Sequence, residues 1–176
     1  MVSLEVDVQV ALTEVSDAPP MSNQQLDMWA NLAYEKVSGL LERADSQMTI
    51  RLVDEQEITQ LNNDYRGKNK ATNVLSFPVE NDFPELIGFD GEADSDLEEF
   101  NLLGDVVICH SVIVHEAEAQ SKSIFDHYAH MVVHGVLHLC GYDHQDEQEA
   151  EKMETLEVRI LAVKQIANPY IAQENA

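Results

Sequence analysis

Three histidines in the last third of the chain have the spacing of a metal site. His134 and His138 are four residues apart, and His144 follows six residues later, beyond Gly141. Residues four apart in a helix project from one face a single turn apart, so both imidazoles can reach one ion. A glycine at the helix end permits a sharp turn that brings His144 back as a third ligand. Three neutral nitrogens and an open fourth position are typical of catalytic zinc, and we predict one zinc ion per chain.

The residue after the first histidine argues against peptide hydrolysis. Zinc peptidases that share the spacing HxxxHxxGxxH carry a glutamate at this place, where it acts as the general base. In this chain the residue is Gly135. A metal activates water or polarises an oxyanion for phosphodiester and amide hydrolysis alike, so a zinc hydrolase acting on a peptide or amide remains an alternative.

A short basic cluster indicates a phosphate-containing substrate. Arg66, Lys68 and Lys70 are three of only ten basic residues in the chain. A guanidinium presents two donors in a fork that matches phosphate and can stabilise charge in a transition state. We assign Arg66 as the candidate catalytic residue and Lys68 and Lys70 as candidate substrate-binding residues. The alternative is that these cations only complement the C-terminal end of a helix.

The overall charge restricts how nucleic acid could bind. The chain has 33 acidic and 10 basic residues, a formal net charge of −23, which opposes broad electrostatic capture of nucleic acid outside a local basic site. Residues 80–99 contain nine acidic and no basic side chains. We expect an exposed acidic loop at about 80–100, which is either simply solvated or a metal-binding or partner-binding patch.

Hydropathy and the N-terminus indicate a cytoplasmic protein. No run reaches the 18 or so apolar residues of a membrane span, and the chain does not begin with the basic and apolar regions of a signal peptide. We therefore expect no membrane contact.

The remaining cysteines and histidines are interpreted as structural. Cys109 and Cys140 lie in apolar runs without CxxC spacing and are expected to be buried thiols. Four histidines lack the ligand spacing: His110, His115, His127 and His130. The last two precede His134 at helical intervals and can lie behind the metal ligands.

Apolar periodicity predicts the secondary structure. Alternation of apolar residues predicts strands at about 3–12, 48–52, 73–78 and 102–108. Helical spacing predicts helices at about 22–44, 54–67, 112–119, 125–140 and 150–161, with Ser22 and Asp54 as N-caps and Gly67 and Gly141 as terminators. The last of these helices is amphipathic and is expected to have an apolar inner side. This pattern predicts one α+β domain over residues 1–176, with a small mixed sheet of about four strands packed with about five helices.

Several motifs together resemble the YbeY family, bacterial metal-dependent endoribonucleases that act in ribosomal RNA maturation. The resemblance extends from about residue 50 to the tail Asn168–Ile171 and rests on the segments Tyr65–Lys68, Thr72–Pro78, Leu103–Asp105 and His134–His144. It implies that the three motif histidines bind zinc, that Arg66 is catalytic and that the substrate is single-stranded RNA.

The resemblance also implies a cellular role. It implies processing of the 3′ end of small-subunit rRNA, a part in ribosome quality control, and action on rRNA within the small ribosomal subunit. The strongly negative charge adds the expectation of a ribosomal or assembly-factor protein partner that places the substrate. A non-catalytic ribosome-assembly factor whose zinc only fixes the fold is the other alternative. No general base is identified, because Asp143 either takes that role or hydrogen-bonds a ligand imidazole.

Overall fold

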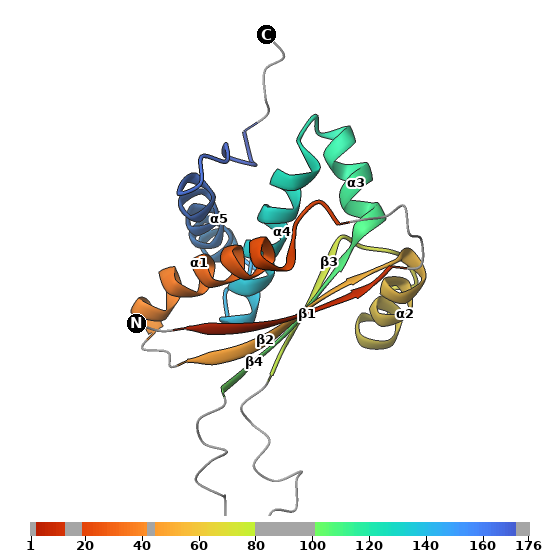
Figure 1. Ribbon diagram of the computed structural model, residues 1–176, viewed down its shortest axis with the longest axis horizontal. Helices are drawn as coiled ribbons and strands as arrows, with labels where there is room; N and C mark the ends of the chain where they lie inside the picture. Colours follow the sequence, from red (N-terminus) through yellow and green to blue (C-terminus); the bar gives the residue numbers. More distant parts are fainter. Residues whose placement is uncertain (1–2, 13–18, 42–44, 80–100, 172–176) are drawn as a thin grey trace, which may run out of the picture.

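The computed structural model describes residues 3–12, 19–41, 45–79 and 101–171. Its elements in chain order are β1 (Leu4–Ala11), α1 (Asn23–Leu41), β2 (Ser46–Val53), α2 (Glu55–Arg66), β3 (Val74–Pro78), β4 (Asn101–Cys109), α3 (His110–Ala119), α4 (Ile124–Leu139) and α5 (Glu147–Ala162) (Figure 1). The acidic loop predicted at about 80–100 lies outside the described residues, as does the end predicted near Ala44 for the first helix.

One mixed sheet carries the helices. The strand order is β1-β2-β4-β3, in which β1, β2 and β4 run parallel and the edge strand β3 pairs antiparallel with β4. The predicted α+β class, with about four strands and five helices, is confirmed for the described part of the chain. The strand order was not predictable from the sequence, because pairing depends on contacts distant along the chain.

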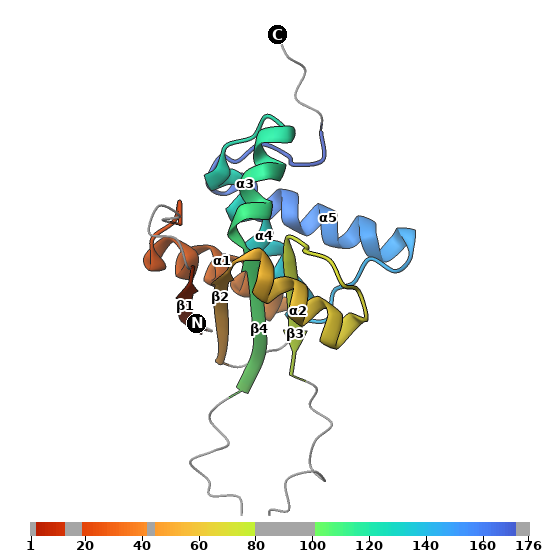
Figure 2. The same cartoon turned by 90° about the vertical axis from the view of Figure 1, so that its right-hand side faces the viewer.

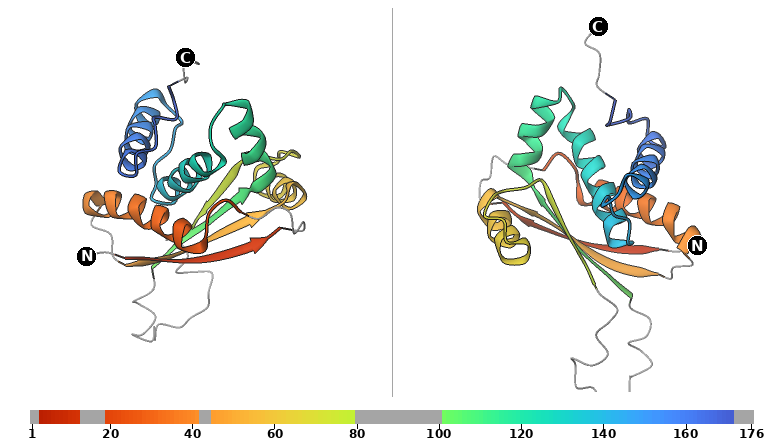
Figure 3. Two further views of the ribbon diagram at one scale, coloured as in Figure 1. Left: turned by 45° about the horizontal axis from the view of Figure 1, so that its top comes forward. Right: turned by 180° about the vertical axis from the view of Figure 1, so that it is seen from behind.

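The two faces of the sheet are covered unequally. Helices α1 and α4 pack on one face with α5 lying across them, whereas α2 lies on the opposite face (Figures 1 and 3). Neighbouring residues of β4 show the alternation: Val106 belongs to the large core under α1 and α4, and Val107 to a small core with Ile58 of α2. Side chains of a strand alternate between faces, so β4 supplies both cores.

The predicted helix signals form as expected. The Oγ of Ser22 accepts from the backbone N–H of Gln25 at 3.2 Å, and the carboxylate of Asp54 accepts from that of Glu57 at 3.0 Å. Gly67 ends α2 in the left-handed region, with φ of 67°. These caps satisfy backbone groups that a helix end would leave unpaired, so local sequence marks these helix ends.

Two other expectations concern the chain as a whole. Cys109 and Cys140 are both buried free thiols, as predicted. None of the helices described has the length and apolar character needed to cross a membrane.

Candidate active site

The structure brings the three motif histidines together. His134 and His138 project from α4, and His144 lies in the connection to α5. The Nε2 atoms of His134 and His138 are 3.0 Å apart, and one ring nitrogen from each of the three histidines lies within 4.8 Å of the others. Ligand nitrogens around a tetrahedral zinc ion are roughly 3.3 Å apart for bonds of about 2.0–2.1 Å, so this cluster fits such an ion.

The end of α4 turns the chain back toward its own last turn. The N–H of Gly141 donates to the carbonyl of His138 at 3.0 Å, and that of Tyr142 donates to the carbonyl of Leu137, also at 3.0 Å. Gly141 has φ of 97°, a conformation that side chains with a Cβ rarely adopt. This reversal brings His144 back over His138, with ring centroids 5.1 Å apart.

The environment of the cluster favours a neutral imidazole at His138. Burial is the main cause that lowers the pKa of His138 to about 4, and repulsion from His134 and His144 adds to it. Metals bind the deprotonated form of a ligand, so a neutral His138 has its lone pair available near neutral pH.

A buried carboxylate lies directly behind the cluster. Glu157 on α5 has no exposed surface. Its Oε1 accepts from Nδ1 of His134 at 2.6 Å, and its Oε2 accepts from Nε2 of His130 at 2.8 Å and from the hydroxyl of Tyr170. Burial by itself would raise the pKa of Glu157, but the hydrogen bonds and charges of His130 and His134 outweigh it and hold the pKa at about 2. The carboxylate is therefore ionised.

The basic cluster forms an exposed turn at the end of α2. Arg66 is the last residue of α2, and Arg66, Lys68 and Lys70 are all exposed. None of the three makes an ion pair with any residue that the structure describes. The main chain, in contrast, is fixed, because the buried Asn62 donates from Nδ2 to the carbonyl of Lys70 at 2.9 Å and accepts the N–H of Lys68 at its own carbonyl.

The edge strand β3 separates the basic turn from the histidines. Tyr65, which precedes Arg66, packs edge-on against Phe77 of β3 with ring centroids 5.0 Å apart. Ser76, the neighbour of Phe77 on the opposite face, has its Oγ 3.4 Å from the carbonyl of Gly135, which follows His134. Helix α2, which ends at the basic turn, and α4, which carries His134 and His138, thus lie on opposite faces of the sheet beside β3 (Figure 2).

The sequence matches the model of the endoribonuclease YbeY family over residues 12–165. The chain belongs to the YbeY endoribonuclease family. An endoribonuclease YbeY from Alteromonas mediterranea is 51% identical, with 96% of this chain and 98% of the relative aligned. That of Hydrogenovibrio crunogenus is 45% identical, with 95% and 98% aligned. The resemblance that the motifs indicated and the prediction of a hydrolytic enzyme are confirmed.

A solved structure supports the fold. The solution structure of a Thermotoga maritima protein matches 96% of this chain and 99% of its own, with a TM-score of 0.52 and 21% identity. At that identity the similarity concerns the fold alone.

The packing of α4 on the sheet explains why glycine follows the first histidine. Gly135 is buried where α4 crosses β4, and a Cβ on it would lie 2.6 Å from Cγ1 of Val106. The glutamate of the zinc peptidases has no room at this position. Close approach of α4 to the sheet therefore requires glycine beside the first histidine.

Other residues discussed from sequence are placed as follows. Asp143 accepts the backbone N–H of His144 at 2.7 Å, and its Oδ1 lies 3.7 Å from Nδ1 of that imidazole. His130 is linked to His134 by Glu157, which contacts both imidazoles, whereas Nε2 of His127 lies 3.2 Å from the carboxylate of Glu116. His110 contacts the hydroxyl of Tyr128 at 2.6 Å, and His115 is exposed on α3.

Sequence reasoning missed Glu157 and Tyr170 in this YbeY-family site. The inner side of α5 was predicted as an apolar stripe, yet Glu157 lies four residues after Met153 and four before Leu161, both of which are buried. An acidic residue in register with an apolar stripe is the signal that could have revealed it, because a carboxylate is rarely buried unless it is paired. No comparable signal marked Tyr170.

Proposed function

We propose that this chain is a zinc-dependent endoribonuclease that cleaves single-stranded RNA. His134, His138 and His144 are the proposed metal ligands, and Arg66 is the proposed catalytic residue. The observation that carries the proposal is the convergence of three histidine donors within 4.8 Å in a member of the YbeY family. A bound metal supplies Lewis acidity and lowers the pKa of a coordinated water.

The chain's own residues bind and orient the phosphate. The guanidinium of Arg66 has no protein partner among the described residues, so its donors are available to a phosphate and to the charge that develops during cleavage. Lys68 and Lys70 bind neighbouring phosphates as point charges. Because β3 separates the two groups, we propose that the RNA strand crosses this edge of the sheet.

The cellular role follows from the family and the charge. We propose that the substrate is rRNA within the small ribosomal subunit, that the reaction matures its 3′ end and serves ribosome quality control, and that it occurs in the cytoplasm. A net charge of −23 opposes binding of free RNA outside a local basic site. A ribosomal or assembly-factor protein is therefore the proposed partner that brings the substrate to the site.

Metal content and RNA cleavage of four variants test the proposal. The protein is purified without added metal or a histidine tag, and zinc is measured by elemental analysis in the wild type, His138→Ala and the control His115→Ala. We expect one zinc per chain in the wild type and the control and none in His138→Ala. No zinc in the wild type would remove the basis of the proposal.

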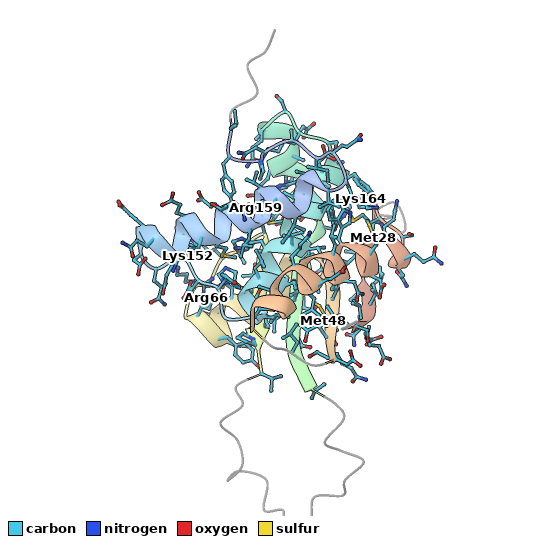
Figure 4. The ribbon with its side chains drawn as sticks, turned by 90° about the vertical axis from the view of Figure 1, so that its left-hand side faces the viewer. Met28, Met48, Arg66, Lys152, Arg159 and Lys164 are labelled. Atoms are coloured by element: carbon cyan, nitrogen blue, oxygen red, sulfur yellow. The ribbon has the colours of Figure 1, made fainter. Side chains whose placement is uncertain are left out.

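Cleavage of an end-labelled single-stranded RNA then tests Arg66. Arg66→Ala is compared with Arg159→Ala, which removes an exposed arginine from α5 instead of α2 (Figure 4). We expect cleavage to be lost only in Arg66→Ala while its zinc content stays at one. Equal activity of the two variants would refute the role of Arg66, and an active zinc-free protein would refute that of the histidines. Unfolding of the zinc-free protein would favour the non-catalytic alternative.

A further inference from the structure

We infer that Glu157 and Tyr170 are positioning residues that orient His134 toward the metal. Through Tyr170, the C-terminal segment Asn168–Ile171 then contributes to the geometry of the metal centre. The inference rests on the proposed metal site. Neither residue belongs to the three-histidine motif, and they reach it from α5 and from the segment beyond it.

The burial of Glu157 requires an explanation other than stability. Its side chain is fully buried, and its partners are two imidazoles and a phenol rather than a lysine or arginine. Replacing a buried ionic group by an apolar residue of similar volume is often neutral or stabilising, so the core of α5 does not need a carboxylate here. A requirement for orienting His134 accounts for it.

The contact with Glu157 selects a tautomer of His134. A carboxyl oxygen lies 2.6 Å from Nδ1 of the ring, which favours the tautomer that has its proton on Nδ1. The lone pair is then on Nε2, which faces Nε2 of His138 at 3.0 Å. Metal-binding histidines commonly donate their second nitrogen to a carboxylate, which holds the ring and increases its basicity.

Tyr170 closes the network from the C-terminal segment. Its ring is 46% exposed, while its hydroxyl reaches Glu157 and lies 3.2 Å from Nε2 of His130. The segment is held by Lys122, whose Nζ donates to the carbonyl of Pro169 at 3.0 Å, and by Asn168, whose Oδ1 accepts the N–H of Tyr170 at 2.9 Å. Because docking of the segment favours the oriented His134, binding of the metal must in turn favour docking of the segment.

The same atoms offer one competing interpretation. Ring nitrogens of His130 and His134 and an oxygen of Glu157 also lie within 4.8 Å of one another, as the ligands of a second ion would. We favour the hydrogen-bonded network, because the tyrosine hydroxyl already contacts the same carboxylate oxygen as His130. The two interpretations predict different metal stoichiometries.

Zinc affinity of the full chain tests the inference. Competition with a zinc chelator is measured for the wild type, Glu157→Gln and Tyr170→Phe, with Glu151→Gln on the exposed side of α5 and Tyr65→Phe as matched controls. We expect Kd to rise about 10-fold to 100-fold in Glu157→Gln and several-fold in Tyr170→Phe, and to stay within about twofold in the controls. Circular dichroism establishes that each variant is folded, and Tyr170→Phe carries the test if Glu157→Gln is not.

A spectroscopic readout separates orientation from general loss of structure. Nitrogen NMR of the metal-free wild type should show the Nδ1–H tautomer of His134, and Glu157→Gln should show a mixture, because an amide can both donate and accept. Unchanged affinity or an unchanged tautomer would overturn the inference, as would two zinc ions in the wild type and one in Glu157→Gln. A wild type without zinc would refute the proposed function, and the tautomer measurement would still decide the inference.

Discussion

The histidine cluster and the basic turn flank one edge strand but are organised in opposite ways. Each proposed ligand on α4 contacts another imidazole or a buried carboxylate, and the ring of His134 is held by Glu157. In the basic turn only the main chain is fixed, by Asn62, and the side chain of Arg66 has no ion-pair partner among the described residues. Folding holds the imidazoles of the first half in place, whereas the cationic side chains of the second half keep their donors exposed.

The difference fits what each half is proposed to bind. A metal ion requires its ligands at fixed separations, so an oriented set lowers the cost of binding. A phosphate of a flexible RNA strand can be bound by long side chains that stay mobile until the RNA binds. The comparison therefore predicts that changes in the first half reduce metal binding, whereas changes in the second reduce cleavage alone.

Removing the metal should give the largest effect and separate the two halves. We expect a chelator to abolish RNA cleavage while the protein remains folded, with a lower Tm because the ligand no longer stabilises the native state. Cleavage assays and thermal scans with and without chelator measure both quantities. Restoration of activity by added zinc is the control, and full activity in excess chelator would contradict a metal centre formed by the histidines.

Replacing Arg66 should come next. We expect Arg66→Ala to lower kcat by about 10²-fold to 10³-fold, the effect typical of losing one group that stabilises transition-state charge. Arg66→Lys should recover only part of this loss, since an ammonium keeps the charge without the forked donors. Zinc affinity and Tm should equal those of the wild type in both variants. A fall in zinc affinity would show that the basic turn and the histidine cluster are coupled, and it would contradict the separation of their roles.

Adding one methyl group beneath the histidines should cost stability. The Cβ of Gly135→Ala would meet Cγ1 of Val106 at 2.6 Å, and overpacking of this kind costs about 1–3 kcal/mol. Chemical denaturation measures the free energy of unfolding. The double variant with Val106→Ala makes room for the methyl group and should be less destabilised than the sum of the single variants. Additive losses would mean that α4 can move away from the sheet.

The parts of this site that the sequence revealed depend on local spacing. His134, His138 and His144 lie within eleven residues, and Gly141 between them marks the turn. The N-caps and Gly67 are equally local, because each acts on a backbone group a few residues away. The basic cluster that contains Arg66 is local too, and the family resemblance supports the catalytic role proposed for Arg66 from its chemistry.

The parts that the sequence did not reveal depend on contacts between distant segments. Glu157 reaches His134 across 23 residues, and Tyr170 reaches His130 across 40. Strand order and the position of β3 between the two halves likewise depend on long-range pairing. Period and propensity describe one element at a time, so they predicted the inner side of α5 as purely apolar and missed the carboxylate within it.

The smallest expected effect is the contribution of a buried histidine outside the motif, His127, to the pH dependence of stability. His127 is 3% exposed, and burial lowers its pKa below the ordinary 6.5. The groups that face it are Glu116 of α3, which raises the pKa, and Lys122 and His130, which lower it. The folded state therefore binds this proton more weakly than the unfolded state does.

The sign of the pH dependence follows from that difference. Above pH 6.5 His127 is neutral in both states and does not lower the free energy of unfolding. Below pH 6.5 the free energy of unfolding falls by at most about 1.4 kcal/mol per pH unit, until the pH reaches the pKa of His127 in the folded state. His127→Gln should flatten this part of the curve, which denaturant unfolding of the metal-free protein between pH 7.5 and pH 5 measures. The exposed His115→Gln is the matched control and should keep the wild-type slope. Equal slopes in all three proteins would mean that Glu116 fully offsets the burial of His127, and that the acid sensitivity arises from the motif histidines.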